Sequence, residues 1–140
     1  MILYAESSAV LAWLLEEPGA ERIADSLAAS ALLITSDLTL VEADRTIECA
    51  TATGRLTSAE AAAARARLAA AHPFWVLMRL SSSILQRARE PFPAEPIRTL
   101  DALHLATILE ARAEVVGLGV LSLDARVRAN AAALSLPVVP

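Results

Sequence analysis

The stretch MILYAESSAVLAWLL, residues 1–15, joins two apolar runs through a short polar break. Its first five residues are typical of a buried strand, and Ser7 and Ser8 favour the start of a helix that Pro18-Gly19 ends. The same order returns in LLITSDLTLVEA, residues 32–43, which predicts a second strand followed directly by a helix. Strands that alternate with helices are typical of a parallel sheet.

The rest of the chain continues this alternation. Thr57-Ser58-Ala59-Glu60 has the pattern of a capping box, and Pro91, Pro93 and Pro96 predict an irregular loop. The expected strands are residues 1–5, 32–35, 74–80, a segment within 115–123, and 137–139. The expected helices are residues 9–15, 20–29, 37–53, 58–71, 81–90, 100–112 and 124–134. We therefore expect one α/β domain over residues 1–140, with helices on both faces of a parallel sheet.

The composition narrows the class of protein. Hydrophobic residues make up 56% of the chain, and much of this is alanine. The longest stretch without a charged residue, 129–140, is about half the length of a membrane-spanning helix. The N-terminus has no basic leader and Glu6 interrupts its apolar run, so we expect no signal peptide and no membrane association. Cys49 is the sole cysteine, so the chain cannot form an internal disulfide, which fits a reducing cytoplasm. We expect the Cys49 side chain to be a small buried apolar group.

The charge of the chain is acidic. The formal net charge is −4, and all twelve basic residues are arginine. Proteins that bind nucleic acid through a broad surface are usually basic. If this chain acts on RNA, it must therefore use a local group of arginines and a metal ion.

Four acidic residues fall where a parallel sheet gathers its ligands. Glu6 follows the first strand and Asp124 follows the strand within 115–123. Glu42 and Asp101 each interrupt an apolar helical stretch. Ligands of such sheets bind beyond the carboxyl ends of the strands, where the strand order reverses. We therefore expect the four carboxylates to lie together.

Each acid also has a purely structural interpretation. Asp101 and Asp124 stand in first helical turns, which favour acids by about 0.3–1 kcal/mol. Glu42 has an interpretation as a solvated residue paired with a nearby arginine. An N-cap role suits Glu6 less well, because glutamate is a poor N-cap and two serines follow it. None of these interpretations explains why all four acids point to one end of one sheet.

Converging carboxylates repel one another unless a cation neutralises them. No cysteine or histidine cluster accompanies these acids, so the ligands are hard oxygens, which suit Mg²⁺ or Mn²⁺ better than zinc. Such an ion polarises a phosphodiester and lowers the pKa of a bound water enough to make it a nucleophile. The pattern therefore favours a site for a hard divalent cation.

Four segments resemble, in order, the motifs of the PIN-domain family, and in particular the VapC-type toxins of bacterial toxin–antitoxin pairs. They are Tyr4-Ala5-Glu6-Ser7-Ser8-Ala9, Leu38-Thr39-Leu40-Val41-Glu42, Arg98-Thr99-Leu100-Asp101-Ala102-Leu103-His104-Leu105-Ala106 and Leu121-Ser122-Leu123-Asp124. The third segment is the most specific of the four. The resemblance spans essentially the whole chain.

The resemblance implies a three-layer α/β/α sandwich and a Mg²⁺- or Mn²⁺-dependent endoribonuclease, with tRNA or ribosomal RNA as its substrate class. It assigns the metal-binding and catalytic carboxylates to Glu6, Glu42, Asp101 and Asp124. It also implies a cognate antitoxin that blocks the site, and a homodimer. The helices near Trp13 and Leu27 are the expected dimer contact, because their apolar stripes are broad for a monomer.

The first acidic position departs from the family, which usually has aspartate where this chain has Glu6. The extra methylene moves the carboxylate by more than the ~0.5 Å tolerance of a catalytic site. Two functions follow: an active ribonuclease, in which Glu6→Asp should raise activity, or a catalytically weak or inactive PIN-like module that binds RNA or a protein partner. A receiver-like or phosphatase domain fits less well, because it needs an aspartate at this position.

Supporting residues surround the four acids. Candidates for holding a water or a substrate phosphate are Ser7, Ser8, Arg45, Thr99 and Ser122, and the serines serve equally well as caps or turn residues. Arg45 lies one turn beyond Glu42, which lets both face one cleft. His104 lies three residues after Asp101, and we expect a hydrogen-bonded core histidine there rather than a metal ligand.

Overall fold

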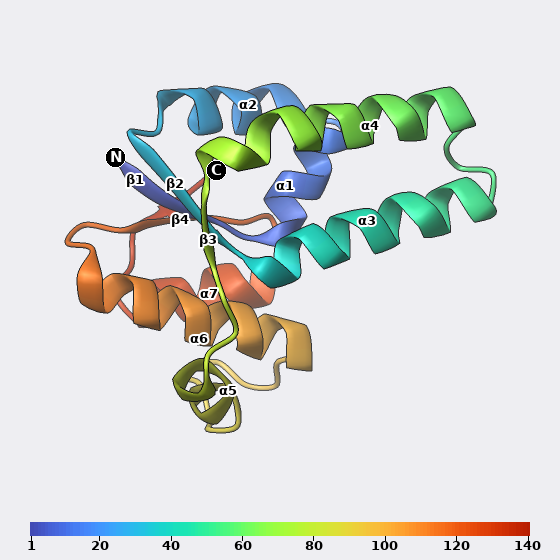
Figure 1. The fold of residues 1–140 in the computed structure, drawn as a ribbon. Helices are drawn as coiled ribbons and strands as arrows, with labels where there is room; N and C mark the ends of the chain where they lie inside the picture. Colours follow the sequence, from blue (N-terminus) through green and yellow to red (C-terminus); the bar gives the residue numbers. More distant parts are fainter.

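The structure is a computed structural model that describes all of residues 1–140, and strands and helices alternate along it (Figure 1). The strands are β1 (Ile2–Ala5), β2 (Leu32–Ser36), β3 (Val76–Met78), β4 (Gly119–Leu121) and β5 (Val138–Val139). The helices are α1 (Ser7–Leu14), α2 (Ala20–Ala29), α3 (Asp37–Ala52), α4 (Ser58–Ala71), α5 (Ser82–Ala88), α6 (Thr99–Glu114) and α7 (Ala125–Ala133), with a 3₁₀ turn at His72–Phe74.

The five strands form one parallel sheet in the order β3-β2-β1-β4-β5. The chain builds outward from β1 to β2 and β3, and then crosses back to place β4 on the other side of β1. The strand order therefore reverses between β1 and β4. In sheets of this kind the crevice beyond the carboxyl ends of the two central strands is the place where ligands bind.

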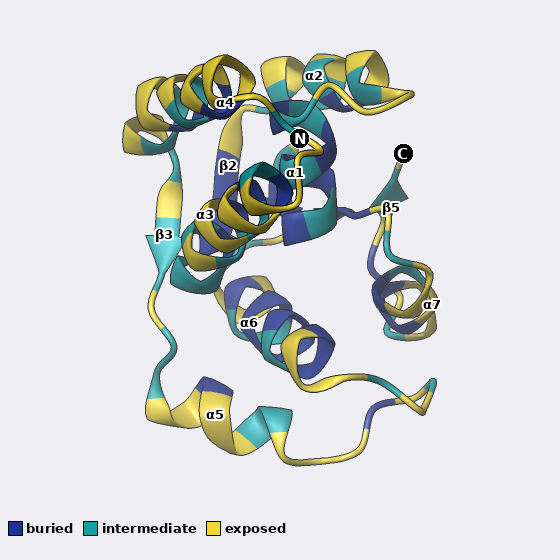
Figure 2. Cartoon of the chain, turned by 90° about the vertical axis from the view of Figure 1, so that its right-hand side faces the viewer, coloured by how far each residue is buried: buried dark blue, intermediate teal, exposed yellow.

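Helices cover both faces of the sheet, as the alternation of elements predicts. Side chains of β1 alternate between the faces: Leu3 and Ala5 pack in the core beneath α1 to α4, whereas Tyr4 points into the core beneath α5 to α7. Figures 1 and 2 show α1, α2 and α4 on one side of the sheet and α5, α6 and α7 on the other. The expected three-layer α/β/α architecture is confirmed.

Helix α6 is the most deeply buried helix of its layer. Leu105 and Ile108 are fully buried, and each contributes about 1.5–3 kcal/mol through the transfer of its side chain out of water. The helix packs between α5 and α7 and beneath the sheet (Figure 2). This packing fixes the orientation of α6, and therefore of the polar residues that it carries at its N-terminal end.

One strand is shorter than the sequence predicts, and another lies where it is expected. The segment expected at 74–80 pairs only over β3, because Pro73 extends the end of α4 into the 3₁₀ turn. The strand expected within 115–123 is confirmed as β4. It begins at Gly119 because α6 continues to Glu114 and Gly117, with φ of 74°, turns the chain back toward the sheet.

The expected burial of Cys49 is wrong, and the apolar stripes expected to form a dimer surface are packed within the chain. Cys49 is exposed on α3 rather than buried. Trp13 packs against Trp75, with ring centroids 6.1 Å apart, and Leu27 packs against the core of the same chain. The apolar surface near α1 and α2 is therefore largely satisfied within the chain. No helix of the structure combines the length and apolar character needed to cross a bilayer.

Candidate active site

A cavity of about 460 Å³ lies at the carboxyl ends of β1 and β4, between α1, α3 and the start of α6. The structure brings all four acids of the sequence motifs to this cavity. The residues that line it are Glu6, Ser7, Ser8, Leu11, Glu42, Arg98, Thr99, Leu100, Asp101 and Asp124. Topology explains the convergence, because each acid follows a strand end or lies near the start of a helix at the same edge of the sheet.

Glu6 is fixed between β1 and α1. Its backbone N–H donates to the carbonyl of Leu121, 2.9 Å away, which continues the pairing of β1 with β4. Its side chain is the N-cap of α1, where Oε2 accepts from the backbone N–H of Ser8 at 3.1 Å and from the Ser8 hydroxyl. The hydroxyl of Ser122 donates to the same oxygen at 2.8 Å. The expectation that a serine would cap this helix is wrong.

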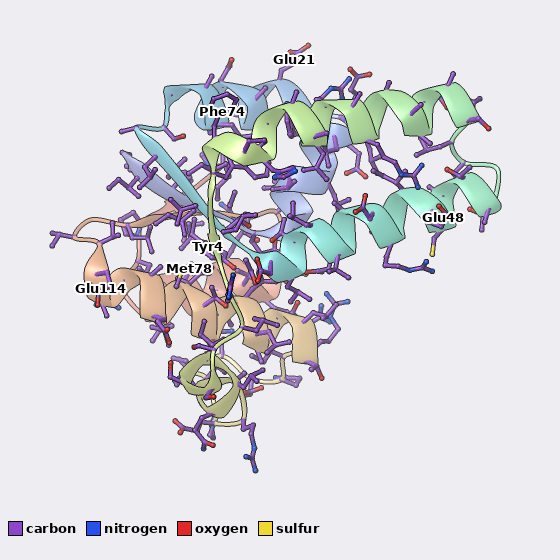
Figure 3. All side chains as sticks on the ribbon, in the orientation of Figure 1. Tyr4, Glu21, Glu48, Phe74, Met78 and Glu114 are labelled. Atoms are coloured by element: carbon purple, nitrogen blue, oxygen red, sulfur yellow. The ribbon has the colours of Figure 1, made fainter.

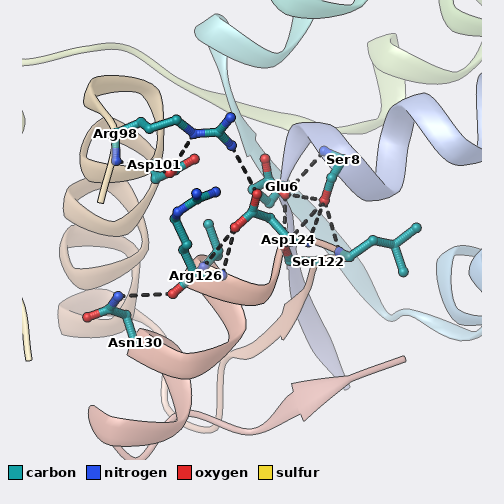
Figure 4. Close-up of polar contacts among 10 residues, drawn as sticks. Glu6, Ser8, Arg98, Asp101, Ser122, Asp124, Arg126 and Asn130 are labelled. Carbon is teal, nitrogen blue, oxygen red and sulfur yellow. Dashed lines mark hydrogen bonds and ion pairs between the residues drawn. The ribbon is translucent and has the colours of Figure 1, made fainter. Parts of the chain in front are cut away.

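Ser8 and Ser122 tie the loop after β4 to α1. The hydroxyl oxygen of Ser8 accepts from the backbone N–H groups of Leu123, at 2.9 Å, and Asp124, at 3.2 Å. The hydroxyl oxygen of Ser122 accepts from the N–H of Asp124 at 3.1 Å. These contacts hold Glu6 and Asp124 at a fixed separation, so both serines support the acids (Figure 4).

Arg98 joins two of the acids (Figure 4). Oδ2 of Asp101 accepts from the backbone N–H of Arg98 at 3.1 Å and from its Nε at 3.2 Å. Nη2 of Arg98 donates to Oδ2 of Asp124 at 3.1 Å. Oδ1 of Asp124 caps α7 by accepting from the N–H groups of Arg126 and Val127. The hydrogen bond to Asp101, together with its charge, raises the pKa of Arg98.

Glu42 lies at the end of a buried polar chain. Its Oε1 accepts from the hydroxyl of Ser7 at 2.6 Å and lies 2.6 Å from Nε2 of His104. Nδ1 of His104 lies 2.8 Å from the hydroxyl of Tyr4, a fully buried residue at the centre of the molecule (Figure 3). Burial, and then the charge of Glu6, raises the pKa of Tyr4 well above its ordinary value, so this hydroxyl stays protonated.

The ionised form of Glu42 is favoured by these contacts. Burial raises the pKa of its carboxyl, but the hydrogen bonds from His104 and Ser7 outweigh burial and leave the pKa below its ordinary value. His104 is buried and hydrogen-bonded, as expected. Its contact with Glu42 was not expected from the sequence. The available signal was its spacing of three residues from Asp101, which places both on one side of α6.

Three of the acids share one arrangement of their oxygens. Glu6 is held through Oε2, Glu42 through Oε1 and Asp101 through Oδ2. No protein group bonds the second oxygen of any of these carboxylates. No buried side-chain oxygen lacks a partner, so the three free oxygens reach solvent. Each of these acids therefore has one anchored oxygen and one oxygen available to a ligand.

The donor chemistry of the cavity fits a hard divalent cation, because its free side-chain donors are carboxylate and hydroxyl oxygens. The acids are not gathered into a tight cage, since no three His, Cys, Asp or Glu side chains are close enough together to hold a metal ion. Arg98 supplies the positive charge between Asp101 and Asp124 instead. A cation that binds here must compete with a guanidinium whose side chain is 65% exposed.

Of the remaining supporting candidates, two line the cavity and one does not. Thr99 and Ser7 line the cavity, and Ser7 bonds Glu42. The expectation for Arg45 is wrong: its side chain is exposed, does not line the cavity, and makes its one polar contact with Sγ of Cys49 at 4.0 Å. One helical turn separates Arg45 from Glu42, but the cavity extends from Glu42 toward α6 and not along α3.

Solved structures of bacterial toxins share this fold. FitAcB from Neisseria gonorrhoeae is 17% identical, with a TM-score of 0.71, and the match covers 100% of this chain and 97% of that chain. VapC20 from Mycobacterium tuberculosis, described as a sarcin-ricin loop cleaving toxin, is 15% identical, with a TM-score of 0.66 and coverage of 91% and 93%. VapBC2 from Rickettsia felis, bound to a DNA fragment from its promoter, is 11% identical, with a TM-score of 0.67 and coverage of 99% and 98%.

A search of curated proteins found no match to the sequence. At these low identities the likeness to solved structures concerns the fold alone. The family is established by the sequence itself, because the model of the PIN domain matches residues 3–133. That range includes all four acids and every strand except β5. The chain belongs to the PIN-domain family.

Proposed function

We propose that this chain is a Mg²⁺- or Mn²⁺-dependent endoribonuclease, the toxin of a type II toxin–antitoxin pair that acts in the cytoplasm. The observation that carries the proposal is the arrangement of Glu6, Glu42 and Asp101, each anchored through one oxygen with the other free in a single cavity. An acid with a purely structural role has no need of a solvent-accessible oxygen that lacks a protein partner. Asp124, whose two oxygens are both bonded, completes the negative charge.

Glu6, Glu42, Asp101 and Asp124 are the proposed ligands of the cation, directly or through water. When bound, the cation supplies polarisation of the phosphodiester and a lowered pKa of water. The chain's own contribution is to place the acids. Hydrogen bonds from Ser7 and His104 hold Glu42 and favour its ionised form, and hydrogen bonds from Ser8 and Ser122 fix the position of the Glu6 carboxylate.

Arg98 has two roles in this proposal, one toward the acids and one toward the RNA. In the structure its guanidinium bridges Asp101 and Asp124 and offsets their repulsion. Its side chain is largely exposed, so it is free to turn outward when a divalent cation takes over this charge. A guanidinium at the rim of the cavity is well suited to bind the two non-bridging oxygens of an RNA phosphate through two parallel hydrogen bonds. The acidic net charge of the chain makes such a local cation necessary.

The proposed substrate class is structured RNA, of the tRNA or ribosomal type. The fold shared with VapC20, a toxin described as cleaving the sarcin-ricin loop, supports this class. A cognate antitoxin is the proposed protein partner, and the fold shared with a toxin–antitoxin complex from Klebsiella pneumoniae supports it. A homodimer is also part of the proposal.

The test is cleavage of total tRNA and of ribosomes by the purified chain, with Mn²⁺, with Mg²⁺ and with EDTA. We expect metal-dependent cleavage by the wild type and a loss of at least about a hundredfold in Asp101→Asn, since removing one catalytic group commonly has this size of effect. The matched control is Glu48→Gln, because Glu48 lies on α3 well outside the cavity, where it pairs with Arg65 (Figure 3). Equal cleavage by wild type and Asp101→Asn would mean that the activity is a contaminant.

A second function also has an observation in its favour. Glu6 stands where the family usually has aspartate, and no three acids form a tight cage. These features fit a catalytically weak or inactive module that binds RNA or a protein partner. That function predicts no cleavage under any metal condition while binding of RNA or of the partner is retained, so the same assay distinguishes the two functions.

A further inference from the structure

We propose that His104 is a positioning residue for Glu42, holding one carboxylate oxygen so that the other faces the cavity. The inference rests on the proposed function, because it concerns how one of the metal-binding acids is oriented. Nε2 of His104 lies 2.6 Å from Oε1 of Glu42, and Oε2 has no partner in the protein. The imidazole, together with the Ser7 hydroxyl that donates to the same oxygen at 2.6 Å, therefore determines which oxygen of Glu42 is presented to the ligand.

The direction of the hydrogen bonds follows from the geometry. A carboxylate oxygen only 2.6 Å from Nε2 requires a proton on that nitrogen, because two lone pairs would otherwise face each other. In the neutral ring Nδ1 is then an acceptor, and the hydroxyl of Tyr4 at 2.8 Å is its donor. The chain of contacts runs from Tyr4 on β1 through His104 on α6 to Glu42 on α3, and each step has a defined donor.

The burial of this chain of contacts argues against a purely structural histidine. His104 is 1% exposed and Tyr4 is fully buried, and Tyr4 belongs to the largely aliphatic core cluster beneath α5 to α7. A well-packed apolar residue is commonly as stabilising as a buried polar group at such a site. The polar network reaches solvent only at Glu42, whose side chain is 19% exposed. The network thus connects the rigid core to Glu42, which lies in the second turn of α3.

Helix α6 carries one residue that lines the cavity and one that positions an acid of another helix. Asp101 and His104 are three residues apart, so both project from one side of the helix. Asp101 lines the cavity directly, whereas His104 lies one turn deeper and reaches across to α3. Helix α6 therefore fixes Asp101, which it carries, relative to Glu42, which lies on α3 and is held by His104.

The test compares His104→Gln with His104→Asn in the full chain. The amide nitrogen of glutamine reaches about as far as Nε2, whereas the amide of asparagine reaches only as far as Nδ1. Isothermal titration with Mn²⁺ gives the affinity, thermal unfolding gives the stability, and tRNA cleavage gives kcat and KM. We expect His104→Asn to weaken Mn²⁺ binding by about 10-fold or more, the usual effect of losing such a partner. His104→Gln should stay within about threefold of the wild type.

The reference variant is Glu42→Gln. If Glu42→Gln binds Mn²⁺ as tightly as the wild type, the metal site of the proposed function is wrong. If Glu42→Gln weakens binding but His104→Asn matches the wild type, the positioning role of His104 alone is overturned. If His104→Asn does not fold, His104→Leu takes its place, since leucine suits the apolar surroundings and also removes the donor. Unchanged Mn²⁺ affinity in that variant, or equal losses in both amide variants at equal stability, would likewise overturn the inference.

Discussion

Glu6 has one methylene more than the aspartate that the family usually has, and this length decides which side chains its carboxylate reaches. Its Oε2 reaches both Ser8 on α1 and Ser122 after β4 while Oε1 remains free. An aspartate is too short to keep both contacts and still present its second oxygen at the same place. The contacts with Ser8 and Ser122 fit the longer acid, and they favour the opposite outcome for Glu6→Asp from the one that the family pattern predicts.

We therefore expect Glu6→Asp to weaken Mn²⁺ binding, by about tenfold for the loss of one charged hydrogen bond. Isothermal titration measures the affinity, and single-turnover cleavage of tRNA should fall in parallel. Glu6→Gln is the companion variant, because it keeps the length and removes the charge. Tighter binding by Glu6→Asp than by the wild type would mean that the usual aspartate geometry is the better one here.

The pKa of Glu42 leads to a prediction about pH. Its folded-state pKa lies below the unfolded value, because hydrogen bonds from His104 and Ser7 outweigh burial. A depressed carboxyl pKa stabilises the fold above the unfolded pKa of about 4.3, and this contribution is lost as the pH falls through the folded pKa.

Urea unfolding of wild type and Glu42→Gln in EDTA, from about pH 3 to pH 7, measures this contribution. The free energy of unfolding of the wild type minus that of the variant should grow as the pH rises through about 4.3 and then level off. Glu48→Gln is the matched control on the same helix. A difference that stays constant across this range, or that shrinks as the pH rises, would contradict the proposed hydrogen bonding.

Among the helices, α4 has a capping box at its start that should stabilise the fold independently of the cavity. The N–H of Glu60 donates to the Thr57 hydroxyl at 3.1 Å, and the N–H of Thr57 donates to the Glu60 carboxylate at 2.7 Å. We expect Thr57→Ala to lower the free energy of unfolding by about 0.5–2 kcal/mol, the usual effect of losing an N-cap. Urea unfolding measures this change, and Mn²⁺ affinity should not alter. A loss of Mn²⁺ affinity would show that α4 and the cavity are coupled.

The elements that the sequence predicts best are those with local signals. The capping box at Thr57 and the Pro18-Gly19 stop bound their helices in the structure as expected. The strand β3 is overextended in the prediction, because apolar residues also occur in the 3₁₀ turn. The N-cap of α1 is predicted wrongly, since intrinsic capping preference favours serine, whereas the contact with Ser122 depends on tertiary structure.

At the scale of the whole molecule, the sequence locates the acids but not their partners. The four carboxylates reach one cavity because strand order and helix starts determine their positions. The bridge from Arg98 to Asp124 and the contact between His104 and Glu42 join residues far apart in the sequence. No local pattern encodes such pairs. Arg45 illustrates the opposite error, since correct helical spacing still leaves it outside the cavity.

The homodimer stays a prediction for the intact molecule. Its expected surface near Trp13 and Leu27 is largely packed within the chain, whereas Phe74, 83% exposed, and Val76 are apolar residues at the free edge beside β3. Light scattering at micromolar protein should give a mass near twice the 14.8 kDa of one chain. The mass of a single chain at this concentration would refute the dimer.

The proposed function requires the acids of one cavity to hold a divalent metal ion, and anomalous diffraction from crystals soaked in Mn²⁺ measures this most directly. We expect one or more manganese peaks between Glu6, Glu42, Asp101 and Asp124, with the guanidinium of Arg98 turned away from Asp101. Crystals of Asp101→Asn, soaked in the same way, should show a weaker peak or none. A wild-type cavity without manganese at saturating concentration, with Arg98 still bridging Asp101 and Asp124, would contradict the account.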